Sequence, residues 1–216
     1  MEQFTGKVWV LGDDIDTDII IPTEYLALPT VEDMKQYGFS PLRPELASQI
    51  QEGDIIVAGK NFGCGSSREQ APEIIKALKV KCVIAKSYAR IFFRNSINNG
   101  LLLIENSDIQ DVIKEGDDLT VNMGESLEFD GKTYPIHPLP DNLMDIINAR
   151  GLVKEMQKWA SAGMDGYIGP QTILAWQKKL GTPIDGKGDI SAEGYRPIEA
   201  AAPAILDRQP VNTPME

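Results

Sequence analysis

A pair of serines and an arginine follow a glycine-rich stretch, and these residue types suit the binding of a small acid. Ser66, Ser67 and Arg68 come directly after Gly63 and Gly65, which allow a tight bend and a close approach of the backbone. The planar guanidinium of an arginine is well matched to a carboxylate. These residues therefore indicate a site for a small anionic substrate.

A helix is expected to begin at the two serines. Ser66 is followed three positions later by Glu69, and Ser67 by Gln70, so either serine completes a capping box. The backbone N–H groups and the positive end of the dipole at such a helix start would stabilise a carboxylate or an alkoxide. A capped helix after a glycine turn, with no ligand at all, explains the same motif on its own.

Other chemistries that use similar motifs are not supported by the sequence. A Walker A loop needs a serine or threonine after its lysine, but Lys60 is followed by Asn61. Arg68 takes the place of the third glycine of a dinucleotide fingerprint. The only histidine, His137, precedes a proline in a predicted turn, which argues against a Ser-His-Asp triad. Cys64 could act as a nucleophile near a helix start, although no second catalytic group accompanies it.

The composition limits the kinds of protein that this chain can be. With 216 residues, of which 42% are apolar and 25% charged, it suits one or two globular domains. The longest apolar runs are far shorter than the roughly 20 residues that cross a bilayer, and no secretory signal is visible, so we expect a cytoplasmic protein with no membrane partner. Two cysteines, Cys64 and Cys82, are too few to hold an iron–sulfur cluster, which would therefore require a second polypeptide.

The charge is unevenly distributed along the chain. The net charge of −11 argues against a nucleic-acid partner and against binding to an anionic membrane. Residues 60–94 are an exception, because they hold eight basic side chains and two acidic ones. Such a basic island is a place where a small anion binds or an acidic partner docks. Solvated helix faces beside a buried strand explain it as well.

Apolar runs separated by turn signals predict an α/β domain with parallel strands. We expect strands at residues 7–11, 54–58, 82–85 and 101–104. We expect helices from residue 66 and over residues 31–37, 88–98, 108–114, 143–147 and 152–159. An extended segment is expected at residues 19–22, and an antiparallel hairpin from residues 118–123 and 127–134. The rest of segment 23–51 is predicted to be a long loop, a kind of segment that often carries function.

Three segments carry a resemblance to a known family. They are GDDIDTDIIIP at residues 12–22, GKNFGCGSSREQAP at residues 59–72 and IAKSYARIFFRNSINNG at residues 84–100. Together and in this order they resemble the small subunit of 3-isopropylmalate dehydratase, of the aconitase superfamily. The resemblance covers about residues 5–158 and implies an aconitase-type swivelling β/α domain, with the antiparallel hairpin added, over residues 1–158.

The resemblance also implies a reaction and a partner. Members of the family interconvert 2-isopropylmalate and 3-isopropylmalate, two small dicarboxylates, by dehydration and rehydration in leucine biosynthesis, which makes them hydro-lyases. The swivel domain closes over a large subunit that carries a [4Fe–4S] cluster, so this chain itself would bind no metal. The low cysteine count agrees with that arrangement.

Roles for individual residues come from the same resemblance. Ser66 would be the base, acting as an alkoxide that its own helix start stabilises, while Ser67 and Arg68 would bind substrate carboxylate. Thr17 and Asp18 match positions near the active site, where they would orient Arg68 or the base. An Asx turn that only shapes the loop is the alternative for these two residues.

Substrate choice is expected to depend on Ala27 and Leu28 in the long loop. Relatives that act on tricarboxylates carry an arginine at about the position of Ala27. A third carboxylate buried against these apolar side chains without a partner would be destabilised, whereas an isopropyl group would gain from the same surface. We therefore expect isopropylmalate as the substrate, with a homoaconitase-type activity as the alternative.

The C-terminal part departs from this family and contains an internal repeat. Met156-Gln157-Lys158 recurs as Trp176-Gln177-Lys178 after 20 residues, and Asp165-Gly166 recurs as Asp185-Gly186 at the same spacing. A repeated helix followed by an Asp-Gly turn is typical of a supersecondary module.

Residues 152–190 resemble the peptidoglycan-binding repeats of phage endolysins. This resemblance implies a small helical repeat after the swivel domain, with weak cell-wall binding as a second candidate function. Residues 191–216 are rich in proline and alanine, and we expect a disordered tail there.

Overall fold

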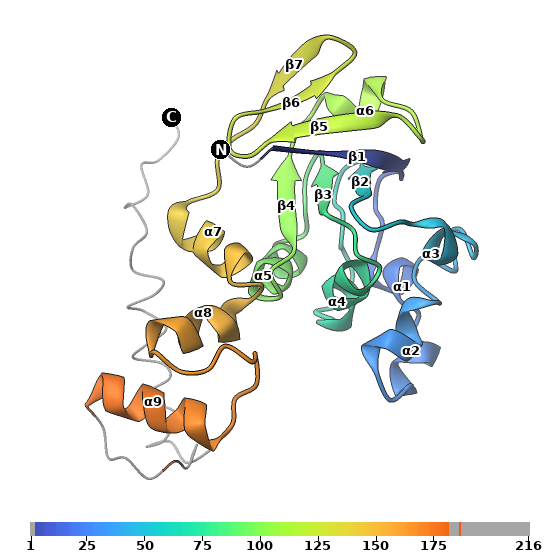
Figure 1. Ribbon diagram of the computed structural model, residues 1–216. Helices are drawn as coiled ribbons and strands as arrows, with labels where there is room; N and C mark the ends of the chain where they lie inside the picture. Colours follow the sequence, from blue (N-terminus) through green and yellow to red (C-terminus); the bar gives the residue numbers. More distant parts are fainter. Residues whose placement is uncertain (1–2, 182–185, 187–216) are drawn as a thin grey trace. The chain divides into compact units, whose positions relative to one another are not determined.

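The computed structural model describes residues 3–181 and residue 186. These residues belong to two compact units, one that ends at Leu139 and one that begins at Pro140 (Figure 1). Within the described part, no helix is both long enough and apolar enough to cross a bilayer. The tail predicted at residues 191–216 lies outside the described residues.

A mixed sheet of seven strands is the framework of the first unit, in the order β4-β3-β2-β1-β5-β6-β7. The strands are β1 (Gln3–Val10), β2 (Ile55–Ala58), β3 (Cys82–Ala85), β4 (Leu102–Glu105), β5 (Asp118–Asn122), β6 (Ser126–Phe129) and β7 (Lys132–Pro135). β1 to β4 pair in parallel, whereas β5, β6 and β7 join the other side of β1 as an antiparallel meander. The predicted parallel strands and the added antiparallel part are confirmed.

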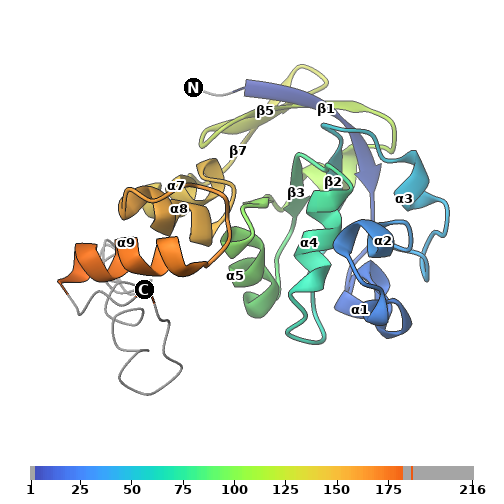
Figure 2. The same ribbon diagram turned by 60° about the horizontal axis from the view of Figure 1, so that its bottom comes forward.

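The parallel strands lie in the core of this unit. All residues of β2 and β3 are buried, as expected for uninterrupted apolar runs in a sheet that helices cover. The amphipathic helices α4 (Gln70–Ala77) and α5 (Arg90–Asn98) follow these strands and lie next to them (Figure 2). Ile74 of α4 and Phe92 of α5 belong to the same buried cluster as Ile56 of β2. Helix packing therefore fixes the strand ends from which the loops of the candidate site start.

The chain between β1 and β2 forms four short helical segments, where one was expected. They are α1 (Thr17–Ile20), the 3-10 helix η1 (Thr23–Ala27), α2 (Val31–Lys35) and α3 (Leu46–Gln49). A further short helix, α6 (Ile109–Val112), follows β4. The helices predicted at residues 31–37 and 108–114 are therefore confirmed, with shorter bounds.

The extended segment predicted at residues 19–22 is wrong for Ile19 and Ile20, which are helical. The carboxylate of Asp16 accepts the backbone N–H of Ile19 at 2.7 Å and caps α1. This local hydrogen bond, together with the burial of Ile20, outweighs the preference of consecutive isoleucines for a strand.

The described part of the second unit is helical. It contains α7 (Asp141–Asn148), α8 (Leu152–Trp159) and α9 (Pro170–Leu180). Met156 and Ala160 pack with Trp176 in a small apolar core. The helices predicted at residues 143–147 and 152–159 are confirmed.

Gln157 fixes the loop that joins α8 to α9 from a fully buried position. Its side-chain carbonyl accepts the backbone N–H of Gly166 at 2.9 Å. Its amide nitrogen lies 2.7 Å from Asp165 Oδ1 and 3.0 Å from both the Tyr167 carbonyl and the Thr172 hydroxyl. One side chain therefore satisfies polar groups from four positions of the loop and of α9.

The same contact recurs in the second copy of the repeat. Gln177 accepts the backbone N–H of Gly186 at 3.0 Å, just as Gln157 accepts that of Gly166. Both glycines have positive φ angles, +80° and +67°, which the turn requires. The repeat seen in the sequence therefore corresponds to a repeated glutamine-to-turn hydrogen bond.

Replacing Gln157 by leucine is expected to lower the free energy of unfolding by about 2–4 kcal/mol, because leucine leaves several buried polar groups without a partner. Urea unfolding followed by tryptophan fluorescence measures the change, since Trp159 and Trp176 both lie in this unit. The matched control is Gln177→Leu at the half-buried equivalent position, with a smaller expected loss. An equal or larger loss in the control would contradict the role given to burial.

Candidate active site

The carboxyl ends of β1 and β2 bring two distant segments together. The strands are parallel neighbours, so the chain leaves both at the same edge of the sheet, residues 12–18 after β1 and residues 59–68 after β2. Backbone N–H groups of Asp14, Gly63 and Thr17 donate to the carbonyls of Lys60, Ile15 and Cys64 at 2.8, 2.7 and 2.9 Å, respectively. These bonds hold the acidic turn against the glycine-rich stretch.

Two glycines are required for this close approach. Gly63 and Gly65 have φ angles of +78° and +93°, in the region that favours glycine. A Cβ atom on Gly63 would lie 2.0 Å from Cγ of Phe92, and one on Gly65 would lie 3.2 Å from the hydroxyl of Thr17. The tight bend predicted from these glycines is confirmed.

The bend places two hydroxyl groups in contact. Oγ of Ser66 lies 3.1 Å from Oγ1 of Thr17, and the backbone N–H of Ser66 donates to the same Thr17 oxygen at 3.1 Å. Thr17 is only 1% exposed, whereas Ser66 is exposed. The Thr17 oxygen accepts the backbone N–H, and the Thr17 hydroxyl can still donate its own hydrogen to Ser66. A buried hydroxyl therefore orients an accessible one.

The helix start predicted at the serines is wrong. α4 begins at Gln70, and its N-cap residue, Glu69, makes no side-chain cap hydrogen bond. The Ser66 hydroxyl instead contacts Thr17, and the Ser67 carbonyl accepts from the Asn95 amide at 3.2 Å, so residues from other segments hold both serines. Because α4 begins four residues after Ser66, the group that contacts the Ser66 hydroxyl is Thr17 and not the start of this helix.

Arg68 precedes α4 and is held by three acceptors. Its Nη1 donates to Oδ1 of Asp18 and to the carbonyl of Ile21, both at 2.8 Å, and its Nη2 donates to the hydroxyl of Thr23 at 3.1 Å. The side chain of Arg68 is 12% exposed, so it is largely enclosed by these neighbours. The resemblance implied that Asp18 orients Arg68 or the base, and the structure places Asp18 in direct contact with Arg68.

The hydrogen bond from Arg68 lowers the pKa of Asp18, and a second hydrogen bond from Thr23 acts in the same direction. Because the folded pKa is lowered, the ion pair is intact above the ordinary pKa of aspartate and is lost only as the pH falls through the lowered value. Asp18 is 57% exposed, so water screens the pair and it adds little to the stability of the fold. Its main effect is to orient Arg68.

Thr23 was missed by the sequence analysis. It donates to Asp18 at 2.9 Å while it accepts from Arg68. The only signal in the sequence was a hydroxyl residue directly after Pro22, five positions beyond Asp18. No pattern identifies such a residue before the fold of the loop is known.

The other predicted site residues are placed less directly. Ser67 is exposed next to Arg68. Ala27 is the exposed last residue of η1, and the half-buried Leu28 packs against the main apolar cluster. The structure thus joins Thr17 to Ser66 and Asp18 to Arg68 by direct contacts, whereas Ala27 and Leu28 are connected to them through η1, which begins at Thr23.

The cysteines are poorly suited to bind metal or to attack a substrate. Burial raises the pKa of the Cys64 thiol, and the neighbouring Asp16 and Asp14 raise it further. Burial raises the pKa of Cys82 strongly, because this residue lies inside β3. Both thiols therefore stay protonated near neutral pH. Among the residues that the structure describes, no group of three or more His, Cys, Asp or Glu side chains is placed to hold a metal ion.

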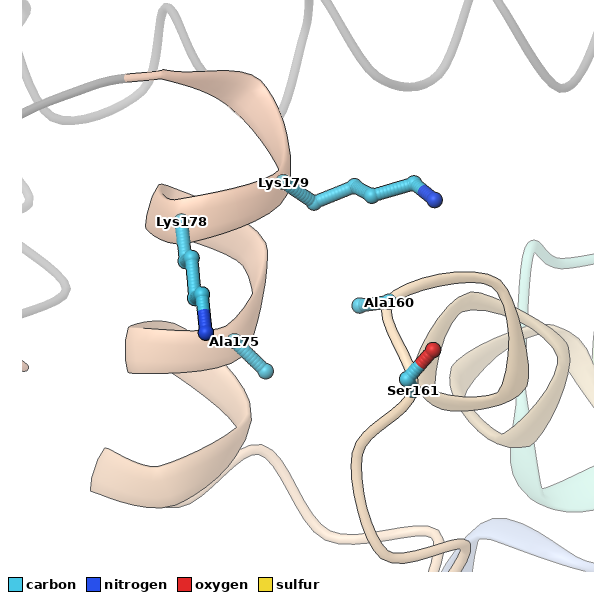
Figure 3. Close-up of a pocket in the computed structure, with 5 residues that line it drawn as sticks. All are labelled: Ala160, Ser161, Ala175, Lys178 and Lys179. Carbon is cyan, nitrogen blue, oxygen red and sulfur yellow. The ribbon is translucent and has the colours of Figure 1, made fainter.

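An open groove of about 500 Å³ lies in the second unit, between the end of α8 and α9 (Figure 3). It is lined by Ala160, Ser161, Ala175, Lys178 and Lys179. The Lys179 ammonium lies 5.4 Å from the ring centre of Trp159. None of the predicted site residues lines this groove, so it is separate from the hydroxyl pair of the first unit.

Known proteins resemble the part of the chain that holds this site. Residues 28–108 match the family model of the aconitase C-terminal domain. A 3-isopropylmalate dehydratase small subunit from Lachnospira eligens is 76% identical over 157 residues, which cover 73% of this chain and 96% of that protein. The chain belongs to the 3-isopropylmalate dehydratase small-subunit family.

More distant members of the 3-isopropylmalate dehydratase small-subunit family agree. A small subunit from Archaeoglobus fulgidus is 49% identical over 152 residues, which cover 69% of this chain and 94% of that protein. A crystal structure of 3-isopropylmalate dehydratase from Methanocaldococcus jannaschii is 39% identical and superposes with a TM-score of 0.69, covering 73% of this chain and 95% of that one. The predicted family and the aconitase-type α/β fold are therefore confirmed.

Membership in the 3-isopropylmalate dehydratase small-subunit family has two consequences. The relatives are subunits of hydro-lyases, and their names imply a large-subunit partner. The aconitase superfamily implies that the large subunit holds an iron–sulfur cluster.

The alignment with the Lachnospira protein covers 73% of this chain, so the remaining quarter has no counterpart in that alignment. The predicted repeat at residues 152–190 stays a prediction.

Proposed function

We propose that this chain is the swivelling subunit of a heteromeric hydro-lyase that interconverts 2-isopropylmalate and 3-isopropylmalate in leucine biosynthesis. Family membership supports the reaction. The contact between Thr17 and Ser66 is the observation that carries the proposed site. A cytoplasmic location of the complex stays a prediction.

Ser66 is the proposed base. Dehydration removes a proton from one carbon and a hydroxyl from its neighbour, so the site needs a group that accepts the proton. A serine hydroxyl is far too weak an acid to ionise near neutral pH unless donors stabilise the alkoxide. Thr17 can supply such a donor from 3.1 Å, and its burial shields this hydrogen bond from competing water.

Arg68 and Ser67 are the proposed clamp for a substrate carboxylate. The contacts to Asp18 and to the Ile21 carbonyl fix the guanidinium before substrate arrives. Asn95 fixes the backbone of Ser67 while the side chain stays exposed. A carboxylate bound here meets a preorganised charge next to Ser66.

The partner's iron–sulfur group is proposed to be a [4Fe–4S] cluster carried by the large subunit. The two protonated thiols of this chain, one of them inside a strand, fit that assignment. When it is bound in the complex, such a cluster supplies a Lewis acid for the hydroxyl that leaves. The part of this chain is to bind the carboxylate through Arg68 and to take the proton at Ser66 Oγ.

Isopropylmalate is the proposed substrate, in preference to homoaconitate. The segment from Thr23 to Ala27 contains no basic side chain, and Leu28 adds apolar surface. This surface favours an isopropyl group and offers no partner to a third carboxylate. Turnover of homoaconitate at a rate comparable with that of 3-isopropylmalate would favour the alternative activity.

Reconstitution tests the proposed function. The chain is purified and mixed anaerobically with the large subunit of Lachnospira eligens, whose small subunit is 76% identical to this chain. We expect interconversion of the two isopropylmalates by the mixture and none by either subunit alone. Absence of turnover in a complex whose assembly is shown by gel filtration would overturn the proposal.

Replacing Arg68 by lysine is expected to raise the KM for 3-isopropylmalate about 10- to 100-fold with a smaller change in kcat. Lysine has no planar fork, so it cannot serve Asp18, the Ile21 carbonyl and a substrate carboxylate together. Steady-state kinetics of the reconstituted enzyme measure the change. Arg90→Lys, at an exposed arginine of α5, is the control and should leave KM unchanged. An unchanged KM in the Arg68 variant would remove the proposed clamp.

Weak cell-wall binding through residues 152–190 is a second candidate function. The glutamine-to-turn contact that both copies share supports a real repeat, and the groove lined by Lys178 and Lys179 offers a surface for it. We propose a swivel domain at residues 1–158 and this repeat after it, with α8 belonging to both. Sedimentation of the full chain with purified sacculi tests the idea. Retention that Lys178→Ala and Lys179→Ala reduce would support it, and no retention would remove it.

A further inference from the structure

The acceptors around Arg68 occupy one edge of its guanidinium. Nη1 donates to both Asp18 and the Ile21 carbonyl, so both of its hydrogens are used. Nη2 donates to Thr23, whose hydroxyl oxygen lies 2.9 Å from the Asp18 oxygen that Nη1 binds. Two acceptors so close to each other, one on each terminal nitrogen, lie along the edge that joins Nη1 and Nη2. The edge formed by Nε and the second hydrogen of Nη2 is left for a ligand.

Thr23 is the residue that binds the second terminal nitrogen, Nη2. Asp18 and the Ile21 carbonyl both bind Nη1, so neither of these two bonds holds Nη2. The hydroxyl of Thr23 adds a fixed point at Nη2 and also donates to Asp18. Only a group that donates and accepts can close this ring, which a hydroxyl does and a carboxylate does not.

We infer that Thr23 is a positioning residue, whose hydroxyl holds Arg68 so that its Nε and Nη2 edge meets a substrate carboxylate. The inference rests on the proposed function, in which Arg68 binds that carboxylate. It adds a residue that has no contact of its own with the reacting atoms. Because Thr23 is exposed, losing its hydroxyl should cost the fold little stability, and the main effect should be on the orientation of Arg68.

Kinetics of the reconstituted complex test the inference with two variants of similar size. Thr23→Val removes the hydroxyl, and we expect it to raise the KM for 3-isopropylmalate about tenfold, as for the loss of one charge-assisted hydrogen bond, with kcat changed less than about threefold. Thr23→Ser keeps the hydroxyl and should restore the wild-type KM. In an Arg68→Lys background, Thr23→Val should change KM by less than about a further twofold, because the guanidinium that Thr23 orients is already absent.

Side-chain NMR of the isotope-labelled free chain gives a readout that does not depend on turnover. Rotation of the Arg68 guanidinium should be about tenfold faster in Thr23→Val than in the wild type, and unchanged in Thr23→Ser. Equal rotation rates in all three proteins would overturn the inference, as would a KM effect that persists in the Arg68→Lys background. A wild-type complex without turnover would instead refute the proposed function, while the rotation rates would still decide whether Thr23 holds Arg68.

Discussion

Replacing Ser66 by alanine is expected to lower the kcat of the assembled enzyme by about 10³-fold or more, since it removes the proposed base. The substitution deletes an exposed hydroxyl, so the fold should be unaffected. KM should change little, because Arg68 and its three acceptors remain in place. Anaerobic steady-state kinetics with 3-isopropylmalate measure both constants.

The neighbouring serine provides the matched control for this experiment. Ser67 is exposed to a similar degree and lies in the same loop, but its hydroxyl does not contact Thr17. Ser67→Ala should therefore raise KM more than it lowers kcat. If Ser66→Ala retained more than about a tenth of the wild-type kcat, a general base of ordinary strength could not be assigned to Ser66.

Thr17 explains why Ser66 rather than Ser67 is given this role. Thr17 receives the backbone N–H of Ser66 and lies 3.1 Å from its hydroxyl, so it can donate to the oxygen that carries the negative charge. The donor is the side chain of a residue at the start of α1, far away in the sequence. The sequence had suggested the dipole of the following helix, which begins four residues after Ser66.

Replacing Gly63 by alanine is expected to lower the free energy of unfolding by about 3 kcal/mol or more, from two causes that add. Alanine is strained at a φ of +78°, and its Cβ would lie 2.0 Å from Cγ of the buried Phe92. The bend could relieve the overlap only by moving, and that would break the hydrogen bond from Gly63 to the Ile15 carbonyl. Urea unfolding measures the loss, and kcat should fall with it because Ser66 follows three residues later.

Gly116→Ala separates the two causes. Gly116 has a similar φ of +87°, but a Cβ there would meet no atom within 4 Å. The backbone strain alone should lower the free energy of unfolding by about 1 kcal/mol. Equal losses at the two positions would show that contact with Phe92 does not matter.

The local sequence pattern predicted the secondary structure correctly where the surroundings of a segment in the fold agree with its own helix or strand preference. Cys82 to Ala85 forms a strand over the predicted residues, because an uninterrupted apolar run is buried on both faces. The helix from Leu152 to Trp159 also has its predicted bounds, since its apolar period agrees with its packing in the second unit. In the first unit, the parallel pairing of β1 to β4 agrees with the alternating strands and helices of the sequence.

Contacts between segments that are distant in the sequence explain the local structure that could not be predicted. The helix after Ser66 begins at Gln70, and the two serines that were expected to cap it are instead bonded to Thr17 and Asn95, from elsewhere in the chain. Ile19 and Ile20 are helical because Asp16 caps them. The grouping of Thr17, Asp18, Ser66 and Arg68 was anticipated through family resemblance, whereas Thr23 has no signature outside the folded loop.

The attachment of η1 bears on how such enzymes diverge during evolution. η1 begins at Thr23, which binds Arg68, and it ends at Ala27, the residue proposed to influence the choice of substrate. In this proposal, substitutions near Ala27 alter which substrate side group is preferred. Thr23 meanwhile continues to hold Arg68, which binds the carboxylate that these acids share. A related enzyme could therefore acquire a different substrate preference through one or two substitutions at this end of η1, while the residues around Arg68 stay the same.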